Sequence, residues 1–96
     1  MLSDGLDIFE LYKDVEIIDS AYKHGVSKED ILHAIHYDLY TETIEMEPNK
    51  TLIIGIDKQN RLLEIICHIT SDDSVIVFHS MECRNYYKER LFSNEK

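Results

Sequence analysis

Residues 51–80 read TLIIGIDKQNRLLEIICHITSDDSVIVFHS, three apolar runs separated by two short polar segments. Apolar runs rich in Ile and Val, with turn-forming residues between them, are typical of β-strands. The expected strands are 51–57, 61–70 and 74–80. Connections this short join antiparallel neighbours, because a parallel pair needs a long crossover. The segment therefore predicts an antiparallel meander.

A fourth strand is expected at 41–46, where Thr and Ile alternate with acidic residues, followed by a turn at 48–50. The run 61–70 is apolar nearly throughout, which favours a central position in the sheet. Five apolar side chains of these strands need burial on one face: Ile53, Leu63, Ile65, Val75 and Val77. Helices must therefore cover that face of the sheet.

The residues before the sheet show a helical period instead. From Phe9 to His24, apolar residues recur at three- and four-residue spacing, which predicts an amphipathic helix, and Gly25 stands where a left-handed cap would end it. Ser27, with Asp30 three residues later, resembles a capping box that begins a second helix. Its core-facing residues are expected to be Ile31, Leu32, Ile35 and Leu39.

A helical pattern returns at residues 83–92, where Tyr87 and Leu91 are four residues apart. The predicted fold class is therefore α+β: two N-terminal helices, a four-stranded antiparallel meander sheet and a C-terminal helix. A chain of 96 residues has room for one core, so residues 1–96 are expected to form a single domain.

The net charge is −9, and it is unevenly distributed. Residues 1–83 carry 6 Lys/Arg and 17 Asp/Glu, whereas residues 84–96 carry 4 Lys/Arg and 2 Asp/Glu. Since phosphate affinity comes from cations, an acidic chain can act on RNA only at a local basic spot, and the C-terminal helix is the candidate. Alternatively, the acidity serves solubility or binds a basic partner protein.

The cysteines and the N-terminal sequence indicate the cellular compartment of the protein. Cys67 and Cys83 stand in apolar surroundings without metal-ligand or redox spacing, so we expect small buried side chains rather than a disulfide. The N-terminus has no basic region followed by an apolar run, and no apolar stretch approaches the length of a membrane span. We expect a cytoplasmic protein without membrane association.

The clearest candidate site lies where the last strand meets the last helix. His79 ends the strand, and Arg84, Tyr87 and Lys88 follow on one face of the helix. Cleavage of RNA by its 2′-hydroxyl needs a base, an acid and a cation for the phosphate. Histidine titrates near neutrality, and arginine grips phosphate with a planar fork. The residue types fit this chemistry, although such a helix face is usually only solvated.

The other histidines have simpler interpretations. His24 lies at the end of the first predicted helix, where the negative end of the helix dipole would stabilise a protonated imidazole; a catalytic role is the alternative. His33 and His36 are spaced to share a metal ion, but no third ligand is evident. By strand alternation, His68 faces away from Leu63 and Ile65, toward solvent or a groove.

A family resemblance sharpens this picture. The segment Lys23-His24-Gly25-Val26-Ser27 resembles the KHGVS segment near the start of BrnT-type toxins, small ribonucleases with a RelE-like fold. The runs 52–55 and 61–65 are also similar. His79, Met81 and Arg84 match the His-x-Met-x-x-Arg ending of a related group of small toxins. The resemblance extends over about residues 20–92.

The resemblance implies a bacterial type II toxin: an endoribonuclease that cleaves mRNA without metal or cofactor and is neutralised by a cognate antitoxin. It leaves open a homodimer or a toxin–antitoxin hetero-oligomer. The implied catalytic residues are His79, Arg84, Tyr87 and His24, and the implied RNA-binding residues are Lys88, Arg90 and Lys23. The low basic content departs from that family. A non-catalytic interaction module that holds a basic partner therefore remains the alternative, and a metal-dependent enzyme is a third.

Overall fold

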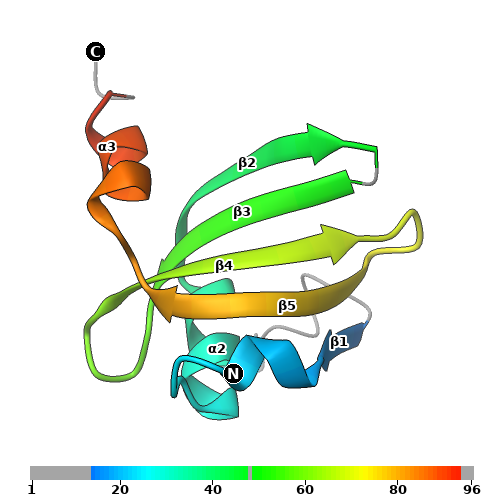
Figure 1. The fold of residues 1–96 in the computed structure, drawn as a ribbon, viewed down its shortest axis with the longest axis horizontal. Coiled ribbons are helices and arrows are strands. Elements are labelled where there is room, and N and C mark those ends of the chain that lie inside the picture. Colours follow the sequence, from blue (N-terminus) through cyan, green and yellow to red (C-terminus); the bar gives the residue numbers. More distant parts are fainter. Residues whose placement is uncertain (1–13, 48, 94–96) are drawn as a thin grey trace, which may run out of the picture.

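A computed structural model describes residues 14–47 and 49–93 (Figure 1). In chain order, the elements are β1 (Asp14–Ile17), the 3₁₀ helix η1 (Asp19–Tyr22), α2 (Lys28–His36), β2 (Asp38–Met46), β3 (Asn49–Ile56), β4 (Leu62–Ile69), β5 (Ser74–Glu82) and α3 (Asn85–Ser93). Among the described residues, no helix combines the length and the apolar character needed to span a membrane. Over the described ranges the fold class is α+β, with one mixed sheet and two α-helices.

The sheet has five strands in the order β1-β5-β4-β3-β2. Strands β2 to β5 form the expected antiparallel meander, and β1 adds a parallel neighbour beside β5. The prediction of four strands was therefore short by one. The turn expected at 48–50 is also partly wrong, because Asn49 and Lys50 already belong to β3 and residue 48 lies outside the described residues.

The prediction of a helix from Phe9 to His24 is wrong wherever the structure describes it. Residues 9–13 lie outside the described residues, β1 takes 14–17, and only a 3₁₀ turn follows. Val15 and Ile17 alternate with two acidic residues, so the segment also carries a strand period. Their packing against the buried residues of β5 favours the strand.

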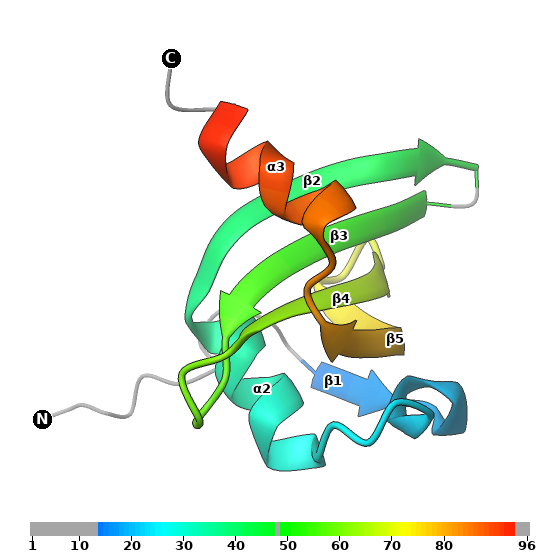
Figure 2. The same cartoon turned by 60° about the vertical axis from the view of Figure 1, so that its left-hand side comes forward.

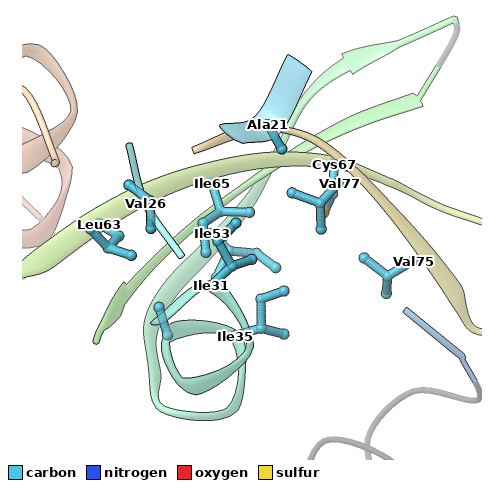
Figure 3. Packing of buried hydrophobic residues seen from close by; sticks show 11 residues of the cluster. Ala21, Val26, Ile31, Ile35, Ile53, Leu63, Ile65, Cys67, Val75 and Val77 are labelled. Carbon is cyan, nitrogen blue, oxygen red and sulfur yellow. The ribbon is translucent and has the colours of Figure 1, made fainter. Parts of the chain in front are cut away.

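Helix α2 covers one face of the sheet, as predicted. The main core lies between them (Figure 3), and it consists of Ala21, Val26, Ile31, Ala34, Ile35, Ile53, Leu63, Ile65, Cys67, Val75 and Val77. Ser27 caps the helix as expected, since its hydroxyl accepts from Asp30 N at 3.1 Å. Leu39, in contrast, was wrongly assigned to the core: it lies in β2 and is exposed.

Gly55 lets α2 approach β3 closely. A Cβ at this position would overlap the Ala34 carbonyl oxygen of the helix backbone. The other glycine next to α2, Gly25, has a left-handed φ of 82°, as the sequence predicted, but it follows the 3₁₀ helix η1 instead of ending the α-helix that was expected before it. The helix axis is thus fixed on the sheet by one residue that has no side chain.

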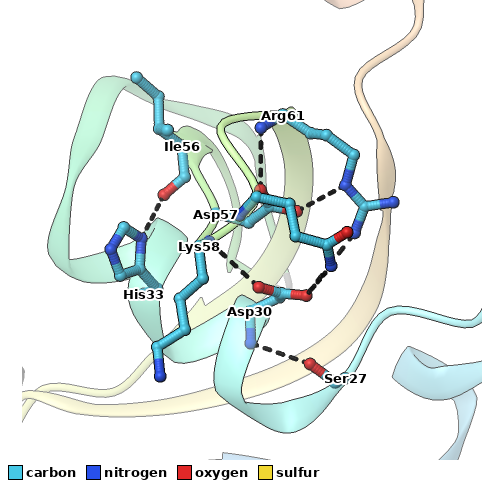
Figure 4. A network of polar contacts seen from close by, with 8 residues as sticks. Ser27, Asp30, His33, Ile56, Asp57, Lys58 and Arg61 are labelled. Atoms are coloured by element: carbon cyan, nitrogen blue, oxygen red, sulfur yellow. Dashed lines mark hydrogen bonds and ion pairs between the residues drawn. The ribbon is translucent and has the colours of Figure 1, made fainter.

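Polar contacts tie the same helix to the β3–β4 hairpin (Figure 4). Buried Asp57 accepts from Arg61 Nε at 2.8 Å and from the backbone N–H groups of Gln59 and Arg61. Asp30 of α2 accepts from Lys58 N and Gln59 Nε2. Both carboxylates are satisfied within this hairpin, so their role is structural.

Helix α3 lies on the opposite face of the sheet from α2 (Figure 2). It packs its Tyr87 and Leu91 on a smaller core that centres on Leu52, Ile54 and Cys83. Arg90 fastens the helix to β2 through an ion pair with Glu42, with 2.7 Å from Nε to Oε1. Among the described elements, α3 packs on this second face of the sheet, and the candidate site lies beside it.

Candidate active site

Glu64 is the centre of the candidate site. It lies in β4 between two main-core residues, Leu63 and Ile65, so strand alternation points it to the α3 face. Its side chain has no exposure to solvent. A buried carboxylate is costly unless charged or polar partners surround it. Two residues from the end of the chain, His79 and Arg84, supply those partners.

Arg84 binds Glu64 with both its side chain and its backbone. Its guanidinium Nη2 lies 2.6 Å from Oε2, Nε lies 3.1 Å from Oε1, and the backbone N–H donates to Oε1 at 2.9 Å. The Arg84 side chain is nevertheless 54% exposed. It therefore holds the buried carboxylate from one side and faces solvent from the other.

His79 reaches the same carboxylate because of a bulge in β5. Cys67 pairs with Val77, but the adjacent Ile66 pairs with His79, so one extra residue, Phe78, stands between these rungs. The bulge reverses the facing of the strand: Val77 points into the main core, and His79 points to the α3 face. There, His79 Nε2 lies 2.9 Å from Glu64 Oε2.

The bulge also brings His24 to the site. Past the end of β1, η1 lies along the edge of β5, where Ser20 Oγ donates to Phe78 O and Ser80 Oγ donates to Ala21 O. The chain then turns at Gly25, which leaves the His24 ring 5.6 Å from the His79 ring, edge to face. Two imidazoles thus stand side by side at the surface.

Tyr87 completes the group from the first turns of α3. The Arg84 guanidinium lies 5.7 Å from its ring centre, within the range of a cation–π contact. The structure thus brings together all four residues that were predicted to be catalytic: His24, His79, Arg84 and Tyr87.

The three predicted RNA-binding residues are less closely gathered. Arg90 is occupied by Glu42 and lies 5.4 Å from the ring centres of both Tyr86 and Tyr87. Lys88 is half-buried on α3, one turn after Arg84. Lys23 is exposed and directly precedes His24. Lys23 and Lys88 are therefore close to site residues along the chain, whereas Arg90 belongs to the attachment of α3.

The electrostatics of the site keep Glu64 ionised. Burial raises its pKa, but hydrogen bonds from Arg84, from the Arg84 backbone N–H and from His79 outweigh burial, so that the pKa lies below its ordinary value of 4.5. The same contact raises the pKa of Arg84. At neutral pH the centre is therefore a carboxylate bound to a guanidinium, with His79 as a third member.

An ionised carboxylate can only accept hydrogen bonds, and this fixes the state of His79. Its Nε2 must carry a proton to donate to Glu64. In the neutral imidazole, Nδ1 is then the unprotonated nitrogen, which suits it to act as a base. His24 provides a second titratable ring beside it.

The remaining histidines lie elsewhere. His33 Nδ1 lies 2.7 Å from Ile56 O, and His68 Nδ1 lies 2.9 Å from Asn49 O. His33 and His36 each contact the Tyr37 ring. Within residues 14–47 and 49–93, no three His, Cys, Asp or Glu side chains are grouped so that they could hold a metal ion.

Glu64 is the residue that sequence reasoning missed. Its signal was present, because a single carboxylate in the apolar run Leu62 to Cys67 is unusual for a central strand. Which cation would meet it depends on the register between β4 and β5 and on the bulge, and neither can be read from local sequence.

Comparison with known proteins adds no relative: no protein-family model, curated protein or solved structure matches this chain. The site must therefore be interpreted from its own geometry.

Proposed function

We propose that this chain is an endoribonuclease that cleaves RNA without a metal ion, and that it acts as the toxin of a type II toxin–antitoxin pair. The observation that carries the proposal is the meeting of His79 and Arg84 at the buried carboxylate of Glu64, with the ring of His24 beside that of His79. The toxin assignment draws its support from the sequence resemblance.

In the proposed reaction, a base removes the proton of a ribose 2′-hydroxyl, and that oxygen attacks the adjacent phosphorus. The bond from phosphorus to the 5′-oxygen breaks, and an acid protonates the departing oxygen. The products are a 2′,3′-cyclic phosphate and a 5′-hydroxyl. All bonds and protons balance without water or a redox partner, so two titratable side chains and one cation suffice.

The geometry favours His79 as the base, since Glu64 holds its Nε2 and leaves Nδ1 for the substrate. His24, whose ring lies 5.6 Å away, would protonate the leaving oxygen. The exposed side of the Arg84 guanidinium would stabilise the negative charge that develops on the phosphate. Tyr87 would contact a base of the RNA, because aromatic rings stack on unpaired bases.

Cleavage of a labelled single-stranded RNA in the presence of EDTA tests this proposal. We expect His79→Ala and His24→Ala each to lower the rate by about 10²–10⁴-fold, the usual contribution of general acid–base catalysis. Both variants should fold, because Arg84 still satisfies Glu64. The matched control is His68→Ala, which removes a histidine outside the site and should leave the rate unchanged.

The product and the substrate provide independent checks. A substrate with a single 2′-deoxyribose at the cleavage position should resist cleavage there, and the product should end in a cyclic phosphate. A folded His79→Ala variant that cleaves RNA at the parent rate would rule out this site. Growth arrest of a bacterial host by the parent chain, but not by His79→Ala at equal protein levels, would support the toxin assignment.

A second candidate function is a non-catalytic binding module, and one observation favours it. All three arginines of the chain already hold carboxylates: Arg61 binds Asp57, Arg84 binds Glu64 and Arg90 binds Glu42. Few cations remain for phosphate on a chain of charge −9. This candidate predicts no RNA cleavage and salt-dependent binding of a basic protein.

A further inference from the structure

We propose that the outer edge of β2 is a docking site for an extended, basic segment of another protein, which would pair with it as an additional strand. The sheet order places β2 at one end. Figure 1 shows it along the rim of the sheet, with α3 near its beginning, and within the described residues no further strand pairs with its outer edge. The interaction would be strand addition, in which backbone hydrogen bonds supply much of the affinity.

Two backbone hydrogen bonds show which way the backbone groups of β3 point. Ile56 N donates to Tyr37 O, on the β2 side, and Asp57 N donates to Arg61 O, on the β4 side. Because backbone groups alternate in direction along a strand, Leu52 and Ile54 share the direction of Ile56 and point toward β2.

The register then identifies the free groups of β2. Leu52 pairs with Glu42 and Ile54 with Tyr40, so these two β2 residues use their backbone groups on β3. The residues between and beside them, Thr41 and Thr43, direct their N–H and C=O groups to the rim. Apart from the hydrogen bonds of the sheet ladders, no backbone–backbone hydrogen bond in the part of the chain that the structure describes involves these groups.

Irregular pairing limits the length of this edge. Register shifts occur between Asp38 and Tyr40 and between Thr43 and Glu45. The regular ladder therefore covers only residues 40–43, and its rim offers two N–H and two C=O groups. Bulges of this kind protect edges from indiscriminate pairing, so the site favours a short and specific strand.

The charge of β2 selects the occupant. Residues 38–47 contain four carboxylates and no Lys, Arg or His. Two of these carboxylates are matched, Glu42 by Arg90 and Glu45 by Lys50, which leaves a charge of −2. A second copy paired antiparallel through β2 would set acid against acid, which destabilises paired strands. A basic strand would instead gain complementary charge.

Exposed apolar side chains beside the edge add a second requirement. Tyr37 and Leu39 are each 54% exposed, and Met46 is 73% exposed. An occupant that alternates basic and apolar residues would cover them while it pairs with Thr41 and Thr43. Strands β3 and β4 separate this edge from β5, so the proposal does not depend on the proposed ribonuclease activity.

The test uses a fluorescein-labelled peptide of nine alternating lysine and valine residues, which matches β2 in length. Anisotropy should show that it binds the parent chain. Thr43→Pro removes an N–H from the rim but leaves the β2–β3 hydrogen bonds in place, so it should weaken binding about tenfold or more. Thr43→Val keeps the N–H group and should bind like the parent.

Peptide variants keep the proposal falsifiable if Thr43→Pro fails to fold. N-methylation of alternate peptide residues, or glutamate in place of lysine, should each weaken binding to the parent about tenfold or more. Absence of binding by the lysine peptide, or equal binding by folded Thr43→Pro, would overturn the proposal. A dimer of the parent that dissociates in Thr43→Pro would identify a second copy as the occupant instead.

Discussion

Replacing Glu64 by glutamine tests the central feature of the site, a buried carboxylate that holds His79 and Arg84. The substitution keeps the shape of the side chain and removes its charge. One carboxylate oxygen accepts from Arg84 N and Nε, and the other accepts from Arg84 Nη2 and His79 Nε2. The amide nitrogen of glutamine would replace one of these two oxygens, and it cannot accept the two hydrogen bonds described for either of them.

The expected cost follows from these contacts. Hydrogen bonds to a charged group contribute ~1.5–3 kcal/mol each, so two lost bonds cost roughly 3–6 kcal/mol. Glutamine is easier to bury than a carboxylate, which offsets part of this loss. We expect Glu64→Gln to lower the free energy of unfolding by about 2–3 kcal/mol at pH 7. Urea unfolding measures this difference, and Glu82→Gln, at an exposed position in β5, is the control.

The destabilisation should depend on pH. The pKa of Glu64 is lower in the folded chain than its ordinary value of 4.5, so the folded state favours the ionised form. Its contribution is therefore fully present above pH 4.5 and is lost as the pH falls through the lower folded-state pKa. The difference between the parent and Glu64→Gln should be constant near neutrality and should shrink below pH 4.5.

Activity provides a second readout. With glutamine at position 64, His79 Nε2 can accept from the amide, and the ring proton then moves to Nδ1. This tautomer cannot act as a base at Nδ1, so we expect cleavage to fall by about 10³-fold even at temperatures where the variant is folded.

Two results would refute this reasoning. Equal urea midpoints for Glu64→Gln and the parent at pH 7 would mean that the carboxylate is not held as the contacts indicate. A stability difference that persists unchanged at pH 3 would assign the effect to packing rather than to charge.

Further predictions concern the packing of the sheet. Gly55→Ala should lower the free energy of unfolding by about 3 kcal/mol or more, because the new Cβ overlaps the Ala34 carbonyl oxygen. Gly25→Ala should lower it by only about 1 kcal/mol, because alanine is strained at the left-handed φ of this position. Thermal unfolding of both variants measures the two effects. Burial raises the pKa of Cys67 to about 12 and that of Cys83 to about 11. At pH 8 both thiols should react with a thiol reagent at least about a hundredfold more slowly than in urea, and equal rates would show that they are accessible.

Much of the architecture could be predicted from local sequence. The Ser27 cap, the left-handed Gly25, the three hairpin connections and the buried cysteines are confirmed. Each depends on residues close together in the chain, where side-chain period and turn chemistry decide the outcome.

The N-terminal segment shows where such reasoning fails. Val15 and Ile17 fit both a helical and a strand period, and the structure selects the strand because it pairs in parallel with β5, some sixty residues later in the sequence. No local signal distinguishes the two, since the deciding contacts are distant in the chain.

The sequence by itself determined which residues were available for chemistry: His24, His79, Arg84 and Tyr87 carry groups suited to proton transfer and phosphate binding. Only the tertiary structure decided that His79 and Arg84 meet at Glu64, with His24 beside His79 and Tyr87 beside Arg84. The physical reason is that side-chain direction in a strand has a period of two, so the single extra residue at Phe78 turns His79 from the main core to the α3 face. A carboxylate with no access to water could then be stabilised only by the cation and the imidazole that this register brought to it.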